Sequence, residues 1–194
     1  YVLSAQSGNT GGLTWAEAGG GSWTYLSGTA LSDTSHLAVA LNNSYKINVI
    51  TIDNFRPITD DTALRIAAAT DGSTFNIGAK ASLSGHRIDG SNNLTTYTGA
   101  PNANGAIAIA GNVGFNNSSG NTLSMVMYLY DFGNTATAHV ADATFTFIDS
   151  SERTSHQSSA IQFGTSNAVT HVQFDMSSGN LRSGNVRLYG IENS

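Results

Sequence analysis

Short segments rich in β-branched and aromatic residues recur through this chain, and residues that favour tight turns separate them. Residues 45–49 show the pattern most simply, because apolar and polar side chains alternate there as on a strand with one buried face. The alternation shifts phase at Ile50 and resumes at Ile52, which predicts a β-bulge at the shift. Further strands are predicted at residues 64–66, 106–109, 125–130, 144–148, 169–174 and 186–191.

The turns between these segments carry glycine, asparagine and aspartate, which tolerate the positive φ of tight reversals. Only residues 60–69 offer a helical alternative, and their TALRIAA core fits a strand equally well. The chain is therefore predicted to be all-β, an antiparallel β-sandwich with a jelly roll as the preferred version. The predicted turn pairs are Asp71-Gly72, Asp89-Gly90, Gly133-Asn134 and Gly179-Asn180.

The surface of such a domain would be polar but weakly charged. Charged residues make up only 11% of the 194 residues, and the net charge is −5. The eight basic residues are scattered singly, so no cluster is available to neutralise phosphates, and nucleic acid is not an expected partner. The absence of cysteine excludes a disulfide framework. No apolar run reaches transmembrane length, so membrane insertion is not expected either.

Residues 1–22, the lead-in, differ in composition from the rest of the chain. Two glycine-rich stretches, 8–12 and 19–21, enclose a short apolar segment, and glycine loses much conformational entropy on ordering unless a partner holds it. The lead-in is expected to be a connector from an upstream segment or assembly partner, with residues 23–194 forming the β-sandwich. A disordered terminus is the alternative. Assembly contacts are predicted for Leu3, Leu13, Trp15 and Trp23, and the ring of Trp23 is expected to close one end of the sandwich.

Several stretches resemble bacteriophage tail-fibre and related virion proteins. In the lead-in, "YVLSAQSG" and "GGLTWAEAGGGSW" are similar to the stretch that joins shaft to terminal domain in such proteins. The single glycine of "ATDGSTF" (69–75) departs from the expected two, which predicts a tighter or differently typed hairpin there. The other similar pieces are "WTYLSGTA" (23–30), "LNNSYKINVITIDNFRPITDDTALRIAAATDGSTF" (41–75), "IAIAGNVGF" (107–115) and "VQFDMSSGNLRSGNVRLYGI" (172–191).

The resemblance implies a non-enzymatic virion structural protein of the tail-fibre or capsid-decoration type, located on the exterior of the phage particle. Such domains usually assemble by three around a shared axis, so a homotrimer that contacts other virion proteins is expected. Two alternatives stay open. One is a receptor- or carbohydrate-binding module at a fibre tip, in contact with a host cell-surface glycan. The other is a polysaccharide depolymerase, because two distant carboxylates are enough for glycoside hydrolysis.

No motif in the chain brings catalytic groups together. There is no Gly-x-Ser-x-Gly elbow, and the five histidines fall singly, without the spacing of a metal site. The two close acidic sets, Asp60-Asp61 and residues 149–152, lack the ligand spacing of a calcium loop and are predicted to be turns or caps. No catalytic, cofactor-binding or metal-ligating residue is therefore predicted, and an enzyme is not expected.

Residues 125–130 combine two methionines, two tyrosines and a leucine. Tyrosine rings there would suit a sugar platform, but the preferred interpretation is a strand buried on both faces. Asn116, in contrast, is expected to contribute almost nothing to stability. The residues predicted to face the core are Phe145, Phe147, Val172, Phe174, Val186 and Leu188.

Overall fold

The chain is described by a computed structural model that covers residues 2–5, 13–16, 23–77, 79–99, 102–103, 107–108 and 114–192. Across these residues every regular element is a β-strand, and the strands pair antiparallel. Two sheets pack against each other around a common hydrophobic core. The predicted all-β sandwich is therefore confirmed, while the jelly-roll connectivity stays a prediction.

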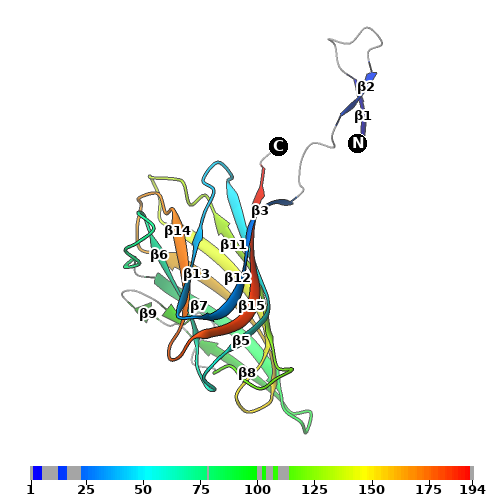
Figure 1. Ribbon diagram of the computed structural model, residues 1–194, viewed down its shortest axis with the longest axis vertical. Coiled ribbons are helices and arrows are strands. Elements are labelled where there is room, and N and C mark those ends of the chain that lie inside the picture. Colours follow the sequence, from blue (N-terminus) through cyan, green and yellow to red (C-terminus); the bar gives the residue numbers. More distant parts are fainter. Residues whose placement is uncertain are drawn as a thin grey trace.

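The larger sheet has nine strands and curves along its length (Figure 1). Its order is β3-β15-β5-β11-β12-β13-β7-β8, and the short β9 also pairs with β7. Consecutive strands β11 to β13 form a meander, whereas β15 places the end of the chain between β3 and β5. The bounds are β3 (Trp23–Thr34), β15 (Leu181–Ile191), β5 (Ile47–Pro57), β11 (Leu123–Tyr130), β12 (His139–Ile148), β13 (Thr154–Phe163), β7 (Ala79–Ile88), β8 (Leu94–Gly99) and β9 (Asn102–Ala103).

The smaller sheet has four strands in the order β10-β6-β14-β4. It consists of β10 (Ile107–Ala108), β6 (Leu64–Ala69), β14 (His171–Met176) and β4 (His36–Ala40). The hairpin-like region predicted at 69–75 is instead a loop that leads from this sheet to the other one, closed by a single bridge between Ala68 and Ile77. In that loop the Asp71 carboxylate accepts the backbone N–H groups of Thr74 and Ser73, which lowers the pKa of Asp71 to about 2.

The lead-in contains a separate two-stranded sheet of β1 (Val2–Ala5) and β2 (Leu13–Ala16). Its register places Leu3 opposite Trp15 and Ala5 opposite Leu13. The side chains of Leu3, Leu13 and Trp15 lie outside the described part of the chain, as do residues 17–22. The assembly role of these three residues and the division at residue 22 therefore stay predictions.

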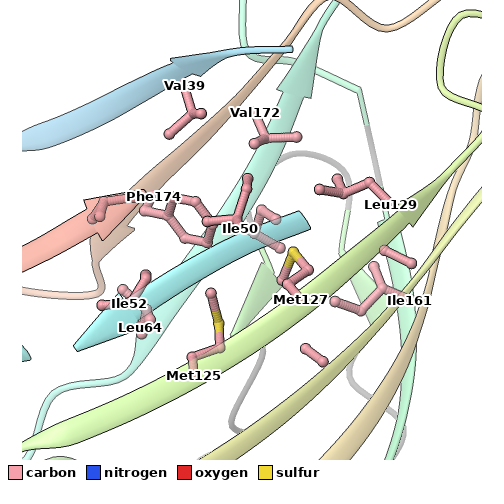
Figure 2. Packing of buried hydrophobic residues seen from close by; sticks show 14 of the residues in the cluster. Val39, Ile50, Ile52, Leu64, Met125, Met127, Leu129, Ile161, Val172 and Phe174 are labelled. Atoms are coloured by element: carbon pink, nitrogen blue, oxygen red, sulfur yellow. The ribbon is translucent and has the colours of Figure 1, made fainter. Parts of the chain in front are cut away.

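The core lies between the two sheets, and on strands such as β11, β12 and β13 it is built by alternation of buried and outward side chains. Figure 2 shows Val172 and Phe174 of the smaller sheet facing Ile50 of the larger one. On β11 the inward side chains include Met125 and Met127, both at most 2% exposed. All six residues predicted to face the core are confirmed, with exposures of 0% to 3%: Phe145, Phe147, Val172, Phe174, Val186 and Leu188.

The predicted bulge exists on β5, but not where the apolar pattern shifts. Residues from Ile47 to Ile52 pair without interruption with both neighbouring strands. The irregularity comes at Asp53 and Asn54, where Asn54 has a φ of 51°. Val49 and Ile50 are both fully buried because they point to opposite faces of the sheet and both faces are covered there.

Asn116 is buried, although little contribution to stability is expected of it. It is only 6% exposed, and its side-chain oxygen accepts the backbone N–H of Ser118 at 2.7 Å. Its own backbone N–H donates to the carbonyl of Ile148. Removing the side chain would take away the acceptor of the Ser118 N–H, which is a reason to expect Asn116→Ala to lower stability. The expectation that it contributes almost nothing stays a prediction, and the burial and hydrogen bond of Asn116 argue against it.

Candidate functional site

The aromatic residues that the core does not use gather on one surface. We call the face of the larger sheet that points away from the smaller sheet the outer face. Tyr128 points to this face because it lies between the buried Met127 and Leu129 on β11. The pairing register then places Val49, Tyr189 and Tyr25 in the same row as Tyr128, and it places Trp23 and Tyr130 together in the adjacent row.

Five rings on this face form a continuous cluster, which we call the aromatic platform: Trp23, Tyr25, Tyr128, Tyr130 and Tyr189. The ring centroid of Trp23 lies 5.4 Å from that of Tyr189 and 6.0 Å from that of Tyr128. Tyr25 extends the cluster beyond Tyr189 at 5.8 Å, and Tyr130 stacks beside Tyr128 at 6.4 Å. These separations lie within the range of favourable aromatic pairs, so each ring helps to fix its neighbour.

The platform is open to solvent. Trp23 is 41% exposed and Tyr25 is 60% exposed, while the other three rings are half-buried. Trp23 therefore lies on the outer face and does not close an end of the sandwich as predicted. The interpretation of residues 125–130 as buried on both faces is likewise wrong, because Tyr128 and Tyr130 face outward.

Two pairs of charged groups lie beside the platform. Arg187 lies two residues before Tyr189 on the outer face of β15, and its guanidinium donates to the Asp53 carboxylate. That bond, helped by Asn185, lowers the pKa of Asp53, and the same contact raises the pKa of Arg187. At the end of the sheet Lys46 donates to Asp131 at 2.9 Å, which is the main reason that the pKa of Asp131 is lowered.

A shallow depression of about 390 Å³ adjoins the platform on the outer face. Its outward-pointing side chains come from β12, β13 and β7 and are small, apart from Asp142. Because these side chains are short, the surface steps down from the tyrosine rings to a lower polar shelf. We call this shelf the serine floor; it consists of Ser82, Ser84, Asp142, Thr144, Ser158 and Ala160.

Asp142 lies where the platform and the floor meet. It is the cross-strand partner of Tyr128, and its carboxylate also lies beside the Tyr130 hydroxyl. Burial and then the Asp142 charge raise the pKa of Tyr130, so this phenol stays protonated and able to donate. Among the residues that the structure describes, no cation pairs with Asp142.

The two acidic sets that are predicted to be turns or caps do accept hydrogen bonds that hold turns and loops. Asp149 is buried and accepts the backbone N–H groups of Ser151 and Arg153 as well as the Arg153 guanidinium. Asp60 accepts the backbone N–H of Asn117, and Asp61 accepts the hydroxyl of Ser150. These carboxylates tie loops together and do not converge on a cleft.

The histidines show one arrangement that their sequence spacing does not reveal. His86 and His156 are cross-strand partners on the outer face, with ring centroids 6.3 Å apart. Within the described ranges, however, no group of three or more His, Cys, Asp or Glu side chains could hold a metal ion. The part of the chain that the structure describes also contains no helix with the length and apolar character needed to span a membrane.

No protein family, curated protein or solved structure matches this chain. The candidate site is therefore defined by its own geometry. Of the four residues predicted to make assembly contacts, only Trp23 has a described side chain, and it belongs to the aromatic platform.

Tyr25, Tyr189 and Asp142 are parts of the site that were not predicted from the sequence. Their positions depend on which strands are neighbours in the sheet, and β3, β15 and β11 are far apart along the chain. Two local signals were nevertheless available. Trp23 and Tyr25 are two residues apart, as are Tyr128 and Tyr130, and that spacing places each pair on one face of a strand. The adjacent apolar residues Val49 and Ile50 are the second signal, because they point to opposite faces of a strand and so indicate that both faces are covered.

Proposed function

We propose that this chain is a non-enzymatic saccharide-binding domain and that the aromatic platform together with the serine floor is its binding surface. The observation that carries the proposal is the cluster of five outward-facing rings beside a polar depression. Strand pairing alone does not require these rings, since other strands of the same sheet carry Ala160 and Ser82 at the corresponding outer positions.

The chemistry of this surface suits a sugar chain. A pyranose ring presents an apolar C–H face, which packs on an aromatic ring, and hydroxyl groups around its edge. Tyrosine combines an apolar ring with a polar hydroxyl, and serine and threonine hydroxyls both donate and accept hydrogen bonds. Apolar contact with a few converging polar groups is the usual composition of a small-ligand site.

The resemblance to phage virion proteins supports a location for this activity. We propose that the domain belongs to the exterior of a virion, on a tail fibre or as a capsid decoration, and that it contributes to attachment to host surface glycan. A shallow, open site binds weakly on its own. Several tethered copies on one particle can raise the overall affinity by about 10² to 10⁴.

The experiment is a calorimetric titration of the purified chain with a panel of oligosaccharides. Tyr128→Ala should weaken binding at least tenfold, because Tyr128 contacts Trp23, Tyr130 and the depression side of the platform. Leu94→Ala is the matched control, since Leu94 is 63% exposed on the same sheet and far along the strand order from the platform. Equal affinity of Tyr128→Ala and the unaltered chain would exclude the platform as the site. Sustained release of reducing ends from a polysaccharide would instead favour the depolymerase.

A homotrimer is a second proposal, and the edge of β3 favours it. This strand ends the strand order and runs for 12 residues, none of them Lys, Arg or Pro. Exposed edges usually carry such residues to prevent pairing with other chains. This edge strand lacks that protection and also carries the exposed rings of Trp23 and Tyr25, so it is suited to contact a second copy.

Sedimentation at micromolar concentration tests the trimer. The expected species has three times the 20.2 kDa mass of the chain. Ser27→Lys, placed on the edge strand, should dissociate it, whereas Thr154→Lys on the central strand β13 should not. A monomer at all concentrations would exclude assembly through this edge. A trimer that binds no saccharide until Ser27→Lys dissociates it would show that the copies cover the platform.

A further inference from the structure

One feature of the proposed binding surface is an electrostatic imbalance at its centre. Asp142 is the only titratable residue among those that line the depression. It lies between the tyrosine rings of β11 and the hydroxyls of β13 and β7. A ligand that spans the platform and the floor must therefore pass this carboxylate.

The charges around Asp142 do not neutralise it. On β11 it faces Tyr128 and Tyr130, which are phenols. Lys46 is held by Asp131 at the end of the sheet, and Arg187 is held by Asp53 on the other side of the platform.

On the side of the serine floor, strands β13 and β7 carry one further cation near Asp142. On β13 its neighbour is Ala160, and the next cation along the sheet is Lys80 on β7. Two strand spacings, roughly 10 Å, separate β12 from β7. Lys80 forms no ion pair with Asp142 within the described residues.

We propose that Asp142 makes this surface selective for saccharides that carry a positively charged amine, over neutral saccharides and most strongly over acidic ones. The inference rests on the saccharide-binding function proposed above and adds the charge of its ligand. An ammonium group on a sugar bound across the step between platform and floor would meet the Asp142 carboxylate. The faces of Tyr128 and Tyr130 would be beside it, and aromatic faces also attract cations.

The expected selectivity is moderate because Asp142 is exposed and water screens its charge. We expect a glucosamine oligosaccharide to bind about fivefold to tenfold more tightly than its N-acetylated counterpart of the same length. A galacturonate oligosaccharide should bind more weakly than either, because its carboxylates are repelled. The preference for the amine should shrink as the salt concentration rises.

The test titrates the full chain with these three hexasaccharides at neutral pH and low salt, where a fraction of the glucosamine amines carries a charge. Asp142→Asn keeps the size of the side chain and removes its charge. It should bring the glucosamine and N-acetylated affinities within about twofold of each other. Glu152→Gln is the control, since it removes one charge from an exposed turn at the far end of β12 and should keep the preference.

The outcomes separate the two proposals. If both neutral and amine-bearing probes bind and Asp142→Asn keeps their ratio, charge selection by Asp142 is excluded while saccharide binding stands. If the N-acetylated or acidic probe binds more tightly than glucosamine, the selectivity is also excluded. If none of the three probes binds to the unaltered chain, both the function and its selectivity are overturned.

Discussion

On β11, Met125, Met127 and Leu129 point into the core, whereas Tyr128 and Tyr130, which alternate with them, lie on the outer face and touch other rings. The inner face of the larger sheet is apolar on nearly every strand, because it must pack against the smaller sheet. Among the described residues of the outer face, the Trp and Tyr rings cluster over β3, β15 and β11, whereas β13 and β7 carry Ser158, Ala160, Ser82 and Ser84 at the positions nearest to them. The strands without Trp or Tyr on this face pair along their whole length, so strand pairing does not by itself require these rings. This contrast is the physical reason to assign stability to one face and binding to the other.

The largest effect should come from truncating the inner face. Phe147 is 2% exposed and its ring centroid lies 4.7 Å from that of Phe115. Phe147→Ala should lower the free energy of unfolding by about 3 to 5 kcal/mol, because it removes buried surface and leaves a cavity. Thermal and denaturant unfolding measure this change in the free energy of unfolding. A change below about 1 kcal/mol would mean that the inner and outer faces of β12 have been exchanged.

A smaller loss of stability is expected from adding a Cβ atom on the inner side of β15. Gly190 is buried, and a Cβ there would lie 2.4 to 2.6 Å from the ring of Tyr45. The ring must move to accommodate it, so Gly190→Ala should cost about 1 to 3 kcal/mol in denaturant unfolding. An unchanged midpoint would show that Tyr45 is free to leave this position.

The same contrast explains what the sequence could and could not predict. Phe145 and Phe147 were assigned correctly to the core, because a two-residue spacing fixes which face a strand residue occupies. The class of fold followed from that alternation and from the turn residues. Gly72 and Gly179 in the predicted turns do have positive φ values, of 78° and 73°.

Features that depend on contacts between distant segments were missed. The bulge was placed at Ile50 because the sequence does not show that aromatic residues from other strands cover Val49. Asn116 was expected to be expendable because nothing local indicates that its turn lies against the buried end of β12. The aromatic platform was missed for the same reason, since its rings come from three strands whose order in the sheet depends on the whole fold.

Truncating a ring on the outer face should lower saccharide affinity strongly and stability only a little, whereas truncating Phe147 mainly lowers stability. Tyr128 is half-buried and contacts Trp23 and Tyr130 edge-on and stacked, respectively. Tyr128→Ala should therefore cost only about 1 kcal/mol in the free energy of unfolding, the scale of an aromatic pair, while saccharide affinity falls at least tenfold. Calorimetric binding and thermal unfolding are measured on the same preparation. A loss of stability as large as that of Phe147→Ala would mean that the platform is a second core.

The smallest effect is expected at Gly28, the outer-face counterpart of Gly190. A Cβ at Gly28 would lie 2.8 Å from the hydroxyl oxygen of Tyr25, which is the far end of a side chain that is 60% exposed. Tyr25 can swing away at little cost, and replacing a strand glycine with alanine reduces the entropy lost on folding. Gly28→Ala should therefore change the free energy of unfolding by less than about 0.5 kcal/mol, whereas Gly190→Ala has a measurable cost. If Gly28→Ala destabilises the chain as much as Gly190→Ala, Tyr25 is held as rigidly as a core ring. Saccharide titration of the same variant then measures whether the Tyr25 position matters for binding.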